Sequence, residues 1–151
     1  NLTGVQLPIT LTTNGTSGAA TFSGNVLNVP NYGNVATSGH YTPTLINTAN
    51  IASSSIIADA NYSRIGNIVT ITLSANVTPT LIGTLTHLTF TLPITTVSTS
   101  QQYIGSGVAW FGSSSSIGTF SVESASTAVF RFVPATTSTS AVSGTFQYRI
   151  D

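Results

Sequence analysis

The residues that could carry out acid–base chemistry are few and widely spaced. The acidic side chains are Asp59, Glu123 and the terminal Asp151. Glycoside hydrolysis needs two carboxylates about 5–10 Å apart, and an active site shared between subunits could combine Asp59 with Glu123. No motif accompanies either residue. A turn position for Asp59 and a solvated strand end for Glu123 are therefore the simpler interpretation.

Histidine and serine chemistry has equally little support. His40 and His87 are the two imidazoles, and their spacing does not pair them as metal ligands. Three copies of one histidine could meet on a trimer axis, but the His-x-His pattern associated with such sites is missing. No Gly-x-Ser-x-Gly elbow opens a helix, because Gly105-Ser106-Gly107 falls within an expected strand. We predict a protein that is not an enzyme and uses no metal or cofactor.

The densest cluster suited to ligand binding lies in residues 101–116. Aromatic faces beside hydroxyl and amide groups recognise carbohydrate without charge. Strand alternation places Trp110 on one face and both Tyr103 and Phe111 on the other, so one set faces inward. A buried Trp110 is the simpler alternative, since large aromatics are usually mostly buried. The candidate ligand-binding residues are Gln101, Gln102, Tyr103, Trp110 and Phe111.

The composition excludes several classes of partner. The 151 residues include three Lys or Arg and three Asp or Glu, which gives a net charge of zero and a charged fraction of 4%. Soluble proteins usually contain about 25% charged residues. The arginines are scattered singly, so we predict no nucleic-acid binding. No apolar run approaches the ~20 residues of a membrane span, and cysteine is absent, which excludes disulfides.

Hydrophobic alternation divides the chain into residues 1–39 and 40–151. The first part has short strands around turns at 14–18 and 23–25. These strands are too short to bury a core within one chain. They must pack against other copies or against the second part. The candidate contacts between copies are Val5, Leu7, Ile9, Leu11, Phe22 and Leu27.

The second part reads as antiparallel β structure, because β-branched and aromatic residues alternate with Ser and Thr. Its clearest hairpin runs from Ala60 to Leu73 around Gly66-Asn67, a dipeptide suited to a type II′ turn. Eight or nine strands are expected, in an antiparallel β-sandwich of jelly-roll or related topology. The side chains predicted to point inward include Val69, Ile71, Phe90, Phe130, Phe132 and Phe146.

Two runs carry a family resemblance. The first is LTTNGTSGAATFSGNVLNVPNY, residues 11–32, with its Gly-x-x-Gly-Ala-Ala turn and Leu-Asn-x-Pro-Asn-Tyr ending. The second includes Tyr-Thr-Pro-Thr-Leu at 41–45, Tyr-Ser-Arg-Ile-Gly-Asn-Ile-Val-Thr at 62–70 and the Leu-Pro pair at 92–93. These runs resemble the shaft end and the start of the head in bacteriophage tail fibres. The match by pattern extends over about the first two thirds of the chain.

The resemblance implies a homotrimer at the tip of a fibre, extracellular and part of the virion. It implies attachment to a bacterial surface glycan or protein, and contact with other tail proteins through a preceding N-terminal part. The absence of methionine agrees with a fragment of a longer chain. The main alternative is a structural cap that trimerises and folds the fibre while another part binds the receptor. A depolymerase is a more distant alternative.

Overall fold

The chain is all-β, as predicted, and forms two compact units, residues 1–36 and 37–151. The computed structural model describes residues 9–14, 18–30, 36–97 and 103–150, with the backbone alone for Tyr103 and Ile104. Within these ranges no helix is long and apolar enough to cross a membrane. The boundary predicted after residue 39 falls inside a strand, Ala36–Tyr41, that pairs in the larger sheet.

The first unit is a three-stranded sheet of three-residue strands. β1 (Thr10–Thr12) runs parallel to β3 (Val26–Asn28), and β2 (Thr21–Ser23) pairs with β3 in antiparallel fashion. The turn between β2 and β3 has positive φ at both central residues, 55° at Gly24 and 65° at Asn25. Positive φ at both positions is the geometry of a type I′ turn, which matches the right-handed twist of a hairpin.

Three of the six apolar side chains that we predicted as contacts between copies lie on the surface of this unit. Ile9 and Leu11 are each 66% exposed, Phe22 is 62% exposed, and Leu27 is partly buried. Val5 and Leu7 lie outside the described residues. Among the described residues of this unit no second layer covers the sheet, so these side chains are exposed.

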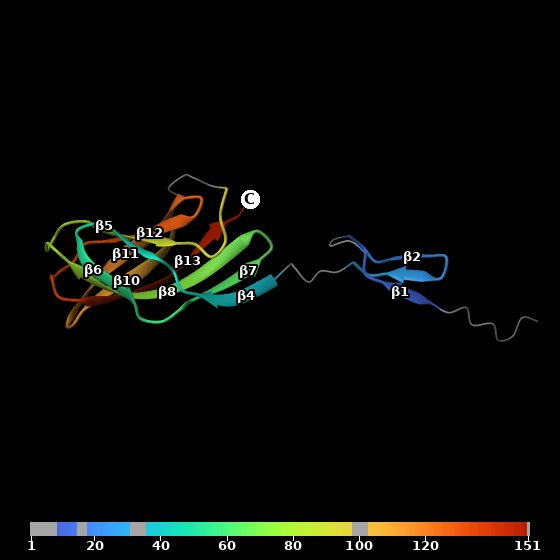
Figure 1. Cartoon of the computed structure of the whole chain (residues 1–151), viewed down its shortest axis with the longest axis horizontal. Coiled ribbons are helices and arrows are strands. Elements are labelled where there is room, and N and C mark those ends of the chain that lie inside the picture. The colour runs from blue at the N-terminus through green and yellow to red at the C-terminus, as the bar shows by residue number, and fades with distance from the viewer. Residues whose placement is uncertain (1–8, 15–17, 31–35, 98–102, 151) are drawn as a thin grey trace, which may run out of the picture. The chain divides into compact units, whose positions relative to one another are not determined.

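The described residues of the second unit form ten strands in one curled antiparallel sheet, against the eight or nine expected (Figure 1). The path through the sheet is β4-β7-β8-β13-β10-β11-β12-β9-β5, and β6 pairs with β8. Its halves face each other across the core, which makes the unit sandwich-like. The strands are β4 (Ala36–Tyr41), β5 (Leu45–Ala49), β6 (Ile51–Ile56), β7 (Ala60–Ile65), β8 (Ile68–Pro79), β9 (Thr86–Thr91), β10 (Tyr103–Phe111), β11 (Ser114–Ser124), β12 (Thr127–Phe132) and β13 (Ser140–Arg149).

A corner between β5 and β6 connects the two halves of the curled sheet. β5 pairs with β9, whereas β6 pairs with β8 along the segment 75–79. Asn50 forms the corner with a φ of 58°, in the left-handed region that asparagine tolerates better than most residues. Its backbone carbonyl accepts a hydrogen bond of 3.1 Å from the Thr80 amide. The chain therefore crosses from one half to the other within a single residue.

The predicted hairpin is confirmed between β7 and β8. Ile65 and Ile68 are paired, so Gly66 and Asn67 form a two-residue turn, and Gly66 has a φ of 58°. Arg64 pairs with Val69. Its Nε donates to the Gly66 carbonyl at 2.7 Å, which lays the side chain along the surface near the turn.

The core is a cluster of phenylalanine rings packed over a row of glycines. The ring of Phe120 stacks on that of Phe146 at 4.9 Å and lies 4.5 Å from that of Phe130, measured between centroids. Gly118, Gly107 and Gly144 oppose one another across β11, β10 and β13. A Cβ on Gly118 would lie 2.3 Å from the Phe130 ring, so only glycine leaves room for it. All the inward predictions are confirmed by burial, namely Val69, Ile71, Phe90, Phe130, Phe132 and Phe146.

Tyr148 is buried and Tyr41 is partly buried, and the hydroxyls of the two tyrosines differ in their hydrogen bonding. The Tyr148 hydroxyl donates to the Ile94 carbonyl at 2.7 Å, and burial is the main cause that raises its pKa to about 12. The Tyr41 hydroxyl is buried without a hydrogen-bond partner among the described residues, and burial raises its pKa. A buried polar group without a partner costs free energy. Tyr41 therefore adds ring packing, in edge contact with Tyr62, but no hydroxyl bond.

Candidate binding surface

Trp110 lies on the outside of the sandwich and Phe111 lies inside. The Trp110 side chain is 56% exposed, which overturns the alternative of a core tryptophan. Phe111 is 8% exposed and its ring lies 6.1 Å from that of Phe132. Our inclusion of Phe111 among the ligand contacts is therefore wrong, because its ring faces the core. Tyr103 belongs to β10 without a described side chain, and Gln101 and Gln102 lie outside the described residues.

The outward face beside Trp110 carries a ladder of uncharged polar side chains on β8 and β13. Each rung joins two hydroxyls, or an amide and a hydroxyl, across neighbouring strands at 2.8 to 3.1 Å. Such cross-strand pairs stabilise a sheet and use up the hydrogen-bonding capacity of its surface. The rungs are Thr70–Gln147, Thr72–Thr145, Ser74–Ser143 and Thr78–Thr139.

One rung is missing from the ladder, and a shallow depression of about 280 Å³ lies there. Asn76 on β8 faces Ala141 on β13, and a methyl group cannot bond the amide. Every residue that lines the depression is an uncharged polar one. The lining residues are Ser53, Ser54, Ser55, Asn76, Thr78 and Thr139.

This depression is not among the candidate ligand-binding residues predicted from the sequence. The signal was present in β8, where Thr70, Thr72, Ser74, Asn76 and Thr78 occupy every second position and so define an entirely polar outward face. The run Ser53-Ser54-Ser55 was equally visible. What the sequence did not contain was the pairing of β6 with the far half of β8, which brings the two sets together.

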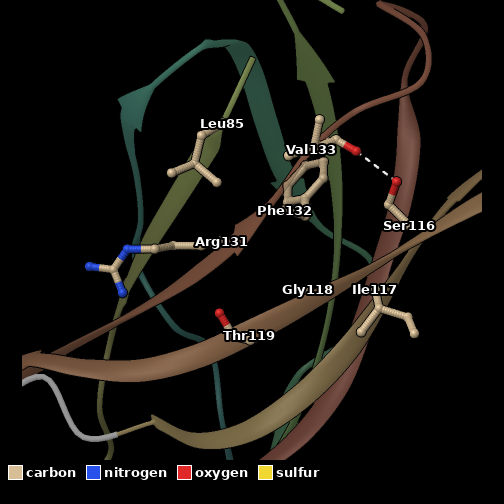
Figure 2. A pocket seen from close by; sticks show the side chains of 8 residues that line it. All are labelled: Leu85, Ser116, Ile117, Gly118, Thr119, Arg131, Phe132 and Val133. Carbon is tan, nitrogen blue, oxygen red and sulfur yellow. Dashed lines mark hydrogen bonds between the residues drawn. The ribbon is translucent and has the colours of Figure 1, made fainter. Parts of the chain in front are cut away.

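A second groove, of about 400 Å³, has mostly apolar walls (Figure 2). Leu85 and Ile117 lie at opposite edges in this view, and the side chains of Arg131 and Thr119 lie toward one end. The Ser116 hydroxyl closes another side by donating to the Val133 carbonyl at 2.6 Å. Ile117 is 81% exposed, the largest value among the described apolar side chains. This groove offers apolar contact and few hydrogen-bond donors.

The Arg131 guanidinium is already engaged in a small polar cluster. It lies 3.9 Å from the Glu123 carboxylate and donates to the Ser121 hydroxyl. The other Glu123 oxygen accepts from Thr89 at 3.0 Å. Glu123 is therefore a paired residue and not the solvated strand end that we expected. Its two oxygens hold β9, β11 and β12 together on the outward face.

His87 pairs with Arg131 across β9 and β12. Partial burial, and next the positive guanidinium, lower the pKa of the imidazole, while Glu123 acts in the opposite direction. A neutral imidazole is therefore favoured beside Arg131.

The remaining chemically capable groups do not gather into a site. Asp59 accepts a hydrogen bond from the Thr42 hydroxyl in an exposed turn before β7, in agreement with a structural role. Glu123, by contrast, has its partners on β9 and β12. His40 is an exposed residue of β4. Within the described ranges, no three His, Cys, Asp or Glu side chains are grouped to hold a metal ion.

No protein-family model, curated protein or solved structure matches this chain. Its function must therefore be inferred from the surface just described and from the sequence resemblance.

Proposed function

We propose that this chain is the tip of a bacteriophage tail fibre, in which three copies assemble and attach the virion to a bacterial surface. The observation that carries the proposal is the exposure of Ile9, Leu11 and Phe22 on a sheet too small to cover them. Large apolar side chains gathered on a short segment favour association, at about 25 cal/mol per Å² of apolar area removed from water. Identical chains can bury the same segment around a closed axis.

The second unit supplies the surface for attachment. Its outward faces combine an exposed tryptophan, a polar depression and an apolar groove, with few charges. A receptor that presents hydroxyl groups and apolar sugar faces suits this surface better than a polyanion does. The resemblance to fibre heads supports the same assignment, and the partners are a bacterial surface glycan or protein and the other tail proteins.

The test combines assembly and attachment. Light scattering of the purified chain should report three chains of 15.5 kDa, and a Leu11→Ser, Phe22→Ser variant should lower that mass. The labelled chain should bind at least one strain in a panel of bacteria, as counted by flow cytometry. Attachment should change little between about 50 and 300 mM salt, because screening acts on charges that this surface largely lacks.

Three outcomes would contradict the proposal in different ways. A monomer at micromolar concentration would remove the trimer. A stable trimer that binds no strain would favour a cap that folds and closes the fibre while another part recognises the host. Steep loss of attachment with salt would contradict an uncharged contact.

A further inference from the structure

The strand register places four outward residues in one row across β10, β13, β8 and β6. Trp110 pairs with Ala141, Ala141 with Asn76, and Asn76 with Ser55. Directly paired residues project from the same face of a sheet. Neighbouring strands lie about 4.8 Å apart, so the row spans about 14 Å. An exposed indole therefore stands on the same surface as the polar depression, two strands from Asn76.

Between the Trp110 indole and the Asn76 amide, the surface of the sheet carries only the small side chain of Ala141. Ala141 is the small residue in a position where the neighbouring rungs carry Ser143 and Thr139. A methyl group adds little height above the sheet. The row therefore has a ring at one end, a shallow floor in the middle, and polar groups at the other end.

The polar side chains at that end can form further hydrogen bonds. The side chains of Ser53, Ser55 and Asn76 make no hydrogen bond with other described residues, whereas the rungs on either side of Asn76, at Ser74 and Thr78, are paired. An amide can donate and accept at once, and a hydroxyl can do the same. Such groups match the vicinal hydroxyls of a sugar. No charged residue lines the depression, so an anionic sugar would gain no partner there.

We propose that Trp110 and the polar depression form one saccharide site for a neutral glycan. The indole ring covers the apolar face of one sugar, and Asn76, Ser55 and Ser53 bond the hydroxyls of the next. This assignment rests on the proposed function and names the receptor class and the residues that would recognise it. The exposed ring contributes through contact area and stacking, and the amide and hydroxyls fix the orientation of the sugar.

The test uses the fact that the chain contains a single tryptophan. The whole chain is applied to an array of neutral oligosaccharides, with uronic-acid, sialylated and sulfated oligosaccharides as a charged set. The neutral sugar that binds best is then titrated while tryptophan fluorescence is recorded. Saturable binding with a change in emission is expected, because the sugar would cover the indole.

Three variants test the site and one serves as a matched control. Asn76→Ala removes the amide, Trp110→Ala removes the ring, and Ala141→Leu fills the floor between them. Each should weaken binding at least tenfold on the array, and calorimetry should give the same loss of affinity. Ser74→Ala, on the same face but in a paired rung, should bind within about twofold of the parent chain. Thermal unfolding establishes that each variant is folded. Ala141→Leu blocks the site while Trp110 and Asn76 both remain, so it tests the site without removing a contact group.

Binding that survives both Trp110→Ala and Ala141→Leu would overturn this site, as would a preference for the charged set. Cell attachment separates this failure from that of the proposed function. If labelled chain binds bacteria but no sugar on the array, the saccharide site is wrong while attachment stands. If it binds neither, the proposed function fails as well.

Discussion

Replacing Asn50 should lower the free energy of unfolding, because its side chain bonds the corner between β5 and β6 to the connection between β8 and β9. Its Oδ1 accepts from the Thr80 hydroxyl at 2.6 Å and the Leu81 amide at 2.8 Å. The two hydrogens of its Nδ2 are shared among three acceptors, the Leu81 carbonyl at 2.9 Å, the Thr84 carbonyl at 3.1 Å and the Thr86 hydroxyl at 2.8 Å. One side chain thus bonds residues near both ends of the connection between β8 and β9.

The expected magnitude follows from these contacts. A hydrogen bond contributes about 0.5–1.5 kcal/mol net, and bonds exposed to water lie at the low end. Four of the five are exposed and the bond to Thr86 is partly buried, so Asn50→Gly should lower the free energy of unfolding by about 2–4 kcal/mol. Asn50→Ala should cost about 1 kcal/mol more, because alanine disfavours the left-handed backbone that glycine accepts.

Urea unfolding followed by circular dichroism measures both variants, at one fixed chain concentration because association would add to stability. Thr80→Ala is the matched control, since it removes a single exposed bond and should cost less than about 1 kcal/mol. If Asn50→Gly and Asn50→Ala were both as mild as the control, the side chain would not be what organises this corner. If the two were equally severe, the left-handed conformation would carry no cost.

Three other predictions concern the core and its surroundings. Gly118→Ala should destabilise the fold by several kcal/mol in urea unfolding, because the added methyl collides with Phe130; an unchanged midpoint would contradict the glycine row. Tyr41→Phe should be neutral or stabilising, whereas Tyr148→Phe should cost about 1–2 kcal/mol, since only the second hydroxyl has a bonded partner among the described residues; reversed costs would refute this difference. Folding lowers the pKa of His87, so the unfolded chain takes up a proton on this residue at higher pH than the folded chain does. The contribution of His87 to the free energy of unfolding is therefore present above the unfolded-state pKa of about 6.5 and is lost as the pH falls from there to the folded-state pKa. The stability difference between the parent chain and His87→Gln should therefore shrink as pH falls from 7.5 to 5, and a constant difference would exclude this linkage.

The sequence alone determined the fold class, the β7–β8 hairpin and the inward set of side chains. A period of two separates the faces of a strand wherever one face is buried, and a Gly-Asn dipeptide fixes the turn between two strands. The sequence therefore predicts that Phe130, Phe132 and Phe146 point inward without any knowledge of strand pairing, and all three are buried. Short strands with uncovered apolar side chains were likewise visible at Leu11 and Phe22.

The tertiary structure decided which face of β10 is outside and what stands beside it. Alternation separated Trp110 from Phe111, but either side could have been the core until β11 and β13 fixed the curvature of the sheet. The row from Trp110 to Ser55 joins residues far apart in sequence, because pairing is set by strand order and register and not by chain distance. Local periodicity gives each strand two faces, whereas the choice of neighbours on those faces depends on how the whole sheet closes over its phenylalanine core.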